Sequence, residues 1–139
     1  MLRASMACGK VLMKRKNGHG EAGCAVEVTL GLIDGKWKGV ILFHLQERLL
    51  RFGELRRKMP GITQRMLTKQ LRALEEDGLI TRTVYPEVPP RVEYALSSTG
   101  QRLRPVIDAL RAWGIEHRAR LEAASAASQK PKIARKRAA

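Results

Sequence analysis

The chain has 139 residues and a formal net charge of +14, which fits one domain with a modest core and a polyanionic partner, nucleic acid ahead of an anionic membrane. Aromatic residues make up 4% of the chain, too few for the base-stacking platforms of single-strand binders, so double-stranded DNA is the favoured partner. No apolar run approaches a membrane span and the first residues lack a signal peptide's apolar block, so we expect a cytoplasmic, nucleoid-associated protein without membrane contact.

Residues 1–23 mix cations, glycine and small side chains, and we expect a flexible basic arm there. The letters GHGEAG at residues 18–23 match the dinucleotide-binding fingerprint. The stretch before them, MKRKN, is no buried strand, so we reject a nucleotide site. Cys8, His19 and Cys24 lack the close spacing of structural zinc ligands, so no metal and no other cofactor is expected. In a reducing cytosol the two cysteines are expected to be thiols.

Two helices are predicted next. Residues 24–33 (CAVEVTLGLI) repeat apolar side chains on one helical face, Asp34-Gly35 breaks the pattern, and residues 36–45 (KWKGVILFHL) continue with a second helix. The residues of the second helix expected to face the core are Trp37, Val40, Ile41 and His44 or Leu45. No acid or nucleophile stands at a useful spacing from His44, which we interpret as a packed histidine. Residues 47–51 are a candidate edge strand.

The central motif spans residues 52–79 (FGELRRKMPGITQRMLTKQLRALEEDGL). Apolar spacing predicts a short first helix through Phe52, Leu55 and Met59, which Pro60-Gly61 ends. A longer helix follows with Thr63 as its N-cap, and Asp77-Gly78 ends it. Its expected buried stripe is Leu67, Leu71 and Leu74. The pattern predicts a helix-turn-helix whose longer helix enters the major groove, although an ordinary helical hairpin with a solvated basic face is the alternative.

A β-hairpin is predicted directly after this motif. Residues 79–85 and 91–97 are β-rich runs on either side of the proline-stiffened tip PEVPP at residues 86–90. The expected core-facing side chains are Ile80, Val84, Val92, Tyr94 and Leu96, whereas Thr81, Arg82 and Thr83 are expected to point outward. A helix-turn-helix with an attached hairpin is a winged helix, which favours DNA binding over the plain hairpin.

The last predicted helix runs from Ser98, capped by Ser97, to about residue 123, with a kink near residues 101–104 caused by Pro105. It carries a wide apolar stripe that a domain this small has little core left to bury. We therefore predict a homodimer interface from the first and last helices, with a helix used only in the core as the alternative. The expected interface residues are Val26, Leu30, Ile107, Leu110, Trp113, His117 and Leu121. Residues 123–139 are predicted to be a disordered basic tail, so that the folded domain spans residues 24–122.

Three stretches taken together, CAVEVTLGLIDGKWKGVILFHL, RFGELRRKMPGITQRMLTKQLRALEEDGLI and RTVYPEVPPRVEYALSSTG, resemble the HxlR family of bacterial transcriptional regulators, which are related to the MarR group. The resemblance covers roughly residues 24–117. It implies a mainly α-helical winged helix-turn-helix with a small β-hairpin wing, acting as a homodimeric repressor or activator on a palindromic operator.

The resemblance also singles out one cysteine. Members commonly carry a cysteine just before the VE of the first helix, followed by proline, and here the residues are Cys24 and Ala25. In some relatives this cysteine senses oxidants or electrophiles. A thiol at a helix start is also reactive because the helix dipole stabilises its thiolate. Cys24 is therefore the redox-sensing candidate, with a buried, inert thiol as the alternative.

The expected DNA contacts lie on the longer helix and the wing. Base edges are assigned to Gln64, Arg65 and Thr68, because arginine can pair with guanine and glutamine with adenine through two hydrogen bonds. Phosphate or wing contacts are assigned to Thr63, Lys69, Arg72, Arg82 and Arg91. The sequence has no motif of convergent catalytic groups, so we do not expect an enzyme. A constitutive regulator, one that responds to an unknown small molecule, and a non-specific nucleic-acid-binding protein remain the alternatives.

Overall fold

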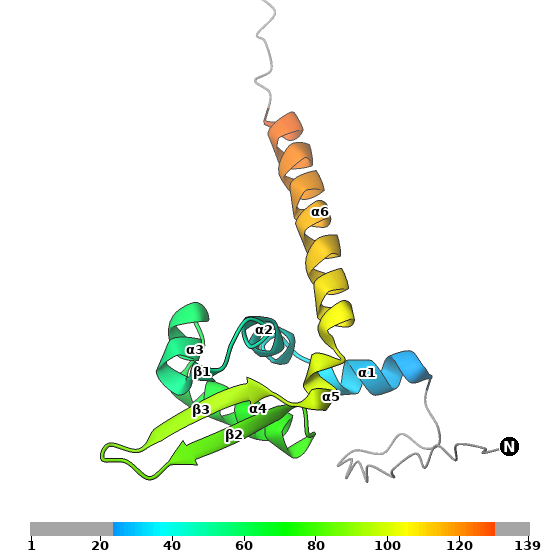
Figure 1. Ribbon diagram of the computed structural model, residues 1–139. Helices are drawn as coiled ribbons and strands as arrows, with labels where there is room; N and C mark the ends of the chain where they lie inside the picture. The colour runs from blue at the N-terminus through cyan, green and yellow to red at the C-terminus, as the bar shows by residue number, and fades with distance from the viewer. Residues whose placement is uncertain (1–23, 130–139) are drawn as a thin grey trace, which may run out of the picture.

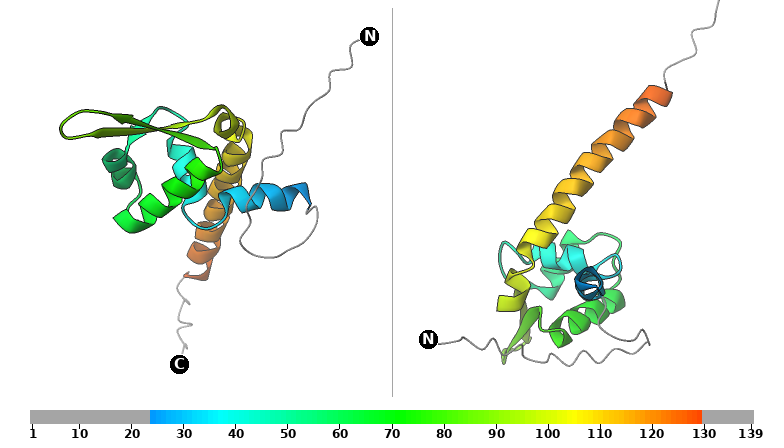
Figure 2. Two further views of the ribbon diagram at one scale, coloured as in Figure 1. Left: turned by 90° about the horizontal axis from the view of Figure 1, so that it is seen from below. Right: turned by 90° about the vertical axis from the view of Figure 1, so that its right-hand side faces the viewer.

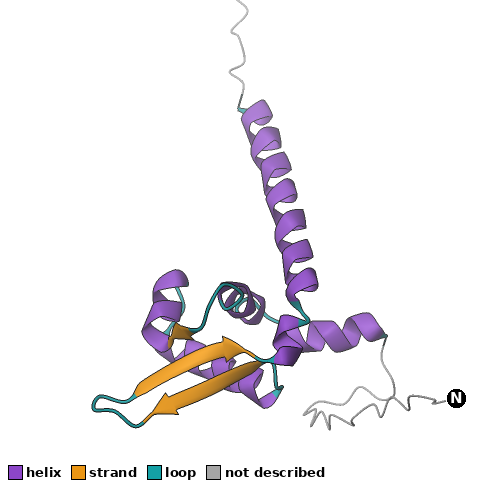
Figure 3. Cartoon of the chain, in the orientation of Figure 1, coloured by secondary structure: helices purple, strands orange, loops and turns teal. Residues whose placement is uncertain are grey.

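The computed structural model describes residues 24–129, most of which are helical, with strands only in one small sheet (Figures 1 and 3). In chain order the elements are α1 (Ala25–Ile33), α2 (Lys38–His44), β1 (Leu50–Arg51), α3 (Phe52–Lys58), α4 (Gln64–Glu76), β2 (Ile80–Tyr85), β3 (Arg91–Leu96), α5 (Ser98–Gln101) and α6 (Arg104–Ser128). The arm expected at residues 1–23, with Cys8 and His19, and residues 130–139 lie outside the described part. The mainly α-helical winged helix-turn-helix is confirmed.

The sheet is antiparallel with the strand order β1-β3-β2. Leu50 of β1 lies opposite Tyr94 of β3, and Ile80 of β2 lies opposite Leu96, so the predicted hairpin and its edge strand are both present. One expectation was wrong, because Val84 is 49% exposed. The hairpin reaches out beyond the helices (Figure 1), so its outer half has no core to face.

The core is formed where the two helices of the helix-turn-helix meet α2 and the base of the sheet. The predicted stripe of α4 is confirmed, with Leu67, Leu71 and Leu74 buried. In α2, Val40 was expected to face the core but is exposed, while Leu42, which was not among the expected core residues, is buried. Helix α2 contacts α1, α3, α4 and α6. Helix α2 is therefore buried on more than one side, and a prediction that assumes one apolar face does not identify all of its buried residues.

The last predicted helix is two helices rather than one kinked helix. Helix α5 ends at Gln101, and α6 begins at Arg104 with Pro105 in its first turn. Proline is tolerated in a first turn, where its missing N–H has no helical partner, but further inside a helix its ring clashes with the carbonyl one turn earlier. The chain therefore restarts its helix at this point instead of bending.

Helix α6 also continues to Ser128, so residues 123–128, which were expected in a disordered tail, are helical. Their sequence, AASAAS, is rich in alanine, the residue with the highest helix propensity. The helix projects away from the sheet and the helix-turn-helix, while α1 lies beside its base (Figures 1 and 2). From residue 108 to residue 129 every residue is exposed in the single chain.

Candidate nucleic-acid interface

The turn between α3 and α4 sets the start of the longer helix. Gly61 adopts a φ of +91°, a conformation that L side chains rarely take, and the buried Ile62 anchors the turn to the core. The Thr63 hydroxyl oxygen accepts a hydrogen bond from the Met66 N–H at 3.1 Å, which confirms the predicted N-cap. Because the hydroxyl accepts in this bond, its own proton remains available to donate to an anion.

The outward face of α4 brings together all five of its expected DNA contacts. Gln64, Arg65, Thr68, Lys69 and Arg72 line one continuous surface, which Ala73 and Glu76 complete at its far end. The Thr68 hydroxyl donates to the Gln64 carbonyl at 2.9 Å, so its oxygen can still accept a bond. Three cations against one carboxylate make this face positive, as contact with phosphates requires.

The two wing arginines lie on opposite faces of the sheet. Arg82 is exposed and lies opposite Tyr94, on the face that buries Ile80. Arg91 instead lies opposite Tyr85, with its guanidinium carbon 4.1 Å from the centre of that ring. Its Nη2 lies 3.4 Å from the Glu87 carboxylate and its Nε 3.5 Å from that of Glu93. The structure therefore leaves Arg82 open to solvent and engages Arg91 inside the hairpin.

One group of exposed cations next to this surface was not singled out from the sequence. Arg56, Arg57 and Lys58 form the last turn of α3, immediately before the turn that leads into α4. The signal available in the sequence was the run RRK, one residue before Pro60-Gly61. The three cations extend the positive surface of α4 only because the turn brings the end of α3 close to the start of α4.

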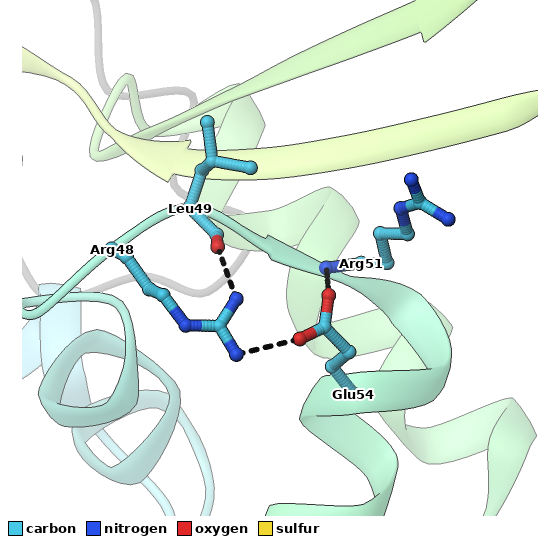
Figure 4. A network of polar contacts seen from close by, with 4 residues as sticks. All are labelled: Arg48, Leu49, Arg51 and Glu54. Atoms are coloured by element: carbon cyan, nitrogen blue, oxygen red, sulfur yellow. Dashed lines mark hydrogen bonds and ion pairs between the residues drawn. The ribbon is translucent and has the colours of Figure 1, made fainter.

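An ion-pair network fixes α3 to the edge strand (Figure 4). The Arg48 guanidinium donates to the Glu54 carboxylate at 2.7 Å and to the Leu49 carbonyl at 3.2 Å, while the Arg51 N–H donates to Glu54 at 3.2 Å. The Arg48 hydrogen bond, and then the one from the Arg51 backbone, hold the pKa of Glu54 below its usual value. The ionised carboxylate thus ties the start of α3 to β1.

His44 is partly buried, in agreement with its interpretation as a packed residue. Burial, and after it the positive charge of Lys58, lower the pKa of His44, although Glu47 raises it. Both main causes favour the neutral imidazole.

Cys24 immediately precedes α1 and is exposed. Its carbonyl accepts the Glu27 N–H at 2.8 Å, while its side chain makes no capping hydrogen bond. On the same helix Val26 and Leu30 are 63% and 56% exposed. The thiol and these apolar side chains are therefore accessible in the single chain.

Most of the residues expected at a dimer interface lie on open surface. Leu110, Trp113 and Leu121 of α6 are exposed, and the Trp113 and His117 rings stack with their centres 4.7 Å apart. Ile107 differs, because at 4% exposure it lies in the core of its own chain, and its burial needs no partner. An apolar groove of about 370 Å³ runs between α1 and α6, lined by Ala25, Val26, Thr29, Leu30, Ile33, Val106 and Leu110.

Among residues 24–129, none of the helices combines the length and the apolar character that crossing a membrane requires. In the same part of the chain, no three side chains of histidine, cysteine, aspartate or glutamate gather into a group that could hold a metal ion.

Comparison with known proteins agrees with the fold. Residues 32–122 match the family described as HxlR-like helix-turn-helix. The chain is 52% identical over 105 residues to the uncharacterized HTH-type transcriptional regulator YdeP of Bacillus subtilis (strain 168), covering 76% of this chain and 82% of YdeP.

Two solved structures extend the comparison. The redox regulator HypR in its reduced form is 49% identical with a TM-score of 0.69, over 72% of this chain and 99% of HypR, and HypR in its oxidised form also matches. The reduced form of the transcriptional regulator YodB from B. subtilis is 33% identical with a TM-score of 0.58, over 66% of this chain and 91% of YodB. Since the family match spans well over half of its length, the chain belongs to the HxlR-like helix-turn-helix family.

Proposed function

We propose that this protein is a transcriptional regulator that binds double-stranded DNA sequence-specifically, as a homodimer on a palindromic operator. The observation that carries the proposal is the outward face of α4, where amide, guanidinium and hydroxyl groups stand together at the start of a capped helix. The name of the similar protein YdeP, an HTH-type transcriptional regulator, supports it. Such a protein would act with the nucleoid in the cytoplasm.

In this proposal the two ends of the α4 face have different tasks. Gln64, Arg65 and Thr68 lie in the first turns of the helix, the part that meets base edges when a recognition helix enters the major groove. Lys69 and Arg72 are farther along and contact phosphates, as do Thr63 at the N-cap and Arg82 on the wing.

The homodimer follows from the apolar surface left open on α1 and α6. Val26, Leu30, Leu110, Trp113 and Leu121 are more than half exposed, and a soluble chain rarely leaves such a row uncovered. A two-fold dimer formed through them presents two copies of α4. Two major grooves on one side of the duplex lie about 34–36 Å apart, which sets the half-site spacing.

Cys24 is the proposed switch of this regulator. Its thiol is exposed at the start of α1, next to the helix face proposed to meet the partner. HypR, which is named a redox regulator, is known in reduced and oxidised forms, and this resemblance supports redox control of this protein. An oxidant that removes two electrons and two protons from two thiols joins them as a disulfide. A bond between two Cys24 residues would reorient the helices of the dimer, and with them the two copies of α4.

The test is to titrate the full chain onto DNA from beside its own gene, with excess competitor duplex, before and after treatment with diamide. We expect specific binding whose affinity changes on oxidation in the native chain and in Cys8→Ser, but not in Cys24→Ser. Specific binding that ignores diamide would leave Cys24 inert and favour a constitutive or ligand-responsive regulator. Equal affinity for all duplexes would instead indicate a non-specific nucleic-acid-binding protein.

A further inference from the structure

At the tip of the wing, Arg91 interacts with three side chains of the hairpin. The Arg91 guanidinium stacks over the Tyr85 ring at 4.1 Å and lies 3.4 Å from the Glu87 carboxylate and 3.5 Å from that of Glu93. Its side chain is 31% exposed, against 54% for Glu87 and 15% for Glu93. A basic residue on a winged helix is ordinarily assigned to phosphates, but here the charge is already paired within the hairpin.

The sheet register explains why these groups meet. Tyr85 of β2 and Arg91 of β3 are cross-strand partners, so their side chains share a face, and Glu93 lies two residues along β3 on that same face. Glu87 reaches Arg91 from the loop that joins the strands. Arg51 of β1 lies opposite Glu93 in the register of the sheet.

The charge balance at the tip opposes contact with phosphates. Residues 85–93 contain two carboxylates and one guanidinium, so that the tip carries one net negative charge. If Arg91 turned toward DNA, it would leave the Tyr85 ring and both carboxylates behind, and those carboxylates would face the same phosphates. Arg82, on the opposite face of the sheet, is under no such restraint because that part of β2 is exposed.

We propose that Glu87 and Glu93 are positioning residues of the wing that set how much it contributes to DNA binding. They hold Arg91 as an internal brace and keep it from DNA phosphates, so that the wing tip adds almost nothing to sequence-independent binding. Phosphate contacts supply affinity for every duplex alike, so withholding one at the tip lowers sequence-independent affinity and makes binding less dependent on salt. The inference rests on the proposed DNA-binding function and deepens it.

The test measures binding of the full chain to a random-sequence duplex between 50 and 200 mM salt, which requires no knowledge of the operator. Each phosphate contact steepens the slope of log affinity against log salt by about 0.9, so that affinity falls by about a further 3.5-fold over this range. We expect Glu87→Gln/Glu93→Gln to bind more tightly at low salt and to show this steeper slope. Adding Arg91→Met should remove the gain, whereas Arg91→Met alone should leave the native slope unchanged.

The variants are chosen to preserve the fold. Glutamine has nearly the shape of glutamate, and methionine keeps an apolar stem over Tyr85, and thermal unfolding checks both. Glu122→Gln is the matched control, because it removes a carboxylate that pairs with Arg118 at 4.0 Å on α6, far from the wing, and should not change the slope. Lys69→Ala is the positive control and should lower the slope by about 0.9.

Three results would overturn the inference. A lower slope for Arg91→Met in the native background would make Arg91 a phosphate contact despite its carboxylates. The inference also fails if Glu87→Gln/Glu93→Gln shows no gain in affinity or slope. It fails as well if the gain persists after Arg91→Met is added, because Arg91 would then not be its source. Failure of the proposed function looks different: without DNA binding by α4, Lys69→Ala would leave the slope unchanged, and without sequence specificity all duplexes would bind equally while the comparison of wing variants would still hold.

Discussion

At the scale of single residues, position on α4 decides what a polar side chain can do. Arg65 is exposed in the first turn, two residues after the Thr63 cap, whereas Lys69 lies one turn farther along the same surface. An arginine near the start of a recognition helix can pair with the two acceptors of guanine, and lysine provides only a compact charge. The two side chains should therefore differ in specificity and not only in strength.

We predict that Arg65→Ala lowers discrimination at one position of each half-site by about 1–3 kcal/mol. The measurement is affinity for the operator and for single-base variants of it at fixed salt. Lys69→Ala is the comparison and should weaken binding to all of these duplexes about equally. If Arg65→Ala behaves in the same uniform way, Arg65 is a phosphate contact.

At the scale of elements, α5 links the end of α4 to the long α6. The Ser97 N–H donates to the Leu79 carbonyl at 3.0 Å, and the Ser97 hydroxyl donates to the Gly78 carbonyl at 2.5 Å and accepts the Gly100 N–H at 3.0 Å. Gly100 permits this approach, because a Cβ there would stand 2.0 Å from the Leu79 carbonyl oxygen. The helix proposed for DNA and the helix proposed for the dimer are thus joined by a tight backbone contact.

Gly100→Ala should therefore destabilise the protein by about 1–3 kcal/mol, the usual range for overpacking, even though alanine is the better helix former. Urea unfolding of both proteins measures the difference. Gly39→Ala in α2 is the matched control, since nothing lies within 4 Å of its added Cβ. There the same change should stabilise by up to about 1 kcal/mol. Equal effects at the two glycines would argue against the close packing of α5.

Sequence alone predicted the elements whose pattern is local and missed what depends on neighbours. Leu67, Leu71 and Leu74 follow from helical spacing, and the Thr63 cap follows from residue type. The exposure of Val84 could not be predicted, because alternation along a strand does not reveal where the core beneath it ends. The engagement of Arg91 by Glu87 and Glu93 likewise depends on the strand register and the path of the loop, which residue type does not reveal.

At the scale of the whole molecule, the open side of α6 is the surface proposed for assembly. Trp113 is 66% exposed in the single chain, and Leu110 and Leu121 continue its row. A charge placed in this row should hardly change the folding free energy of the protomer, because it stays in water there. It should weaken the association free energy of a dimer that buries it. The row therefore offers a way to separate folding from assembly.

We predict that Trp113→Glu raises the dimer dissociation constant at least about tenfold, equivalent to roughly 1.4 kcal/mol, while the far-ultraviolet circular dichroism stays native. Analytical ultracentrifugation over a concentration series measures the constant. Ala119→Glu is the control, since it adds the same charge to the same helix away from the apolar row. A dimer that Trp113→Glu leaves intact would place the interface elsewhere.

Because so much of α6 is exposed in the single chain, the stability of the protein should depend on its own concentration. Most of the stability of a helix in a protein comes from the packing of its apolar face, so the order of α6 depends on the surface that covers it. If the cover is a second copy, the melting temperature rises with concentration, as mass action requires. A cell that makes few copies would then hold a chain that is less ordered and more easily degraded, and expression level itself would set a threshold for regulation.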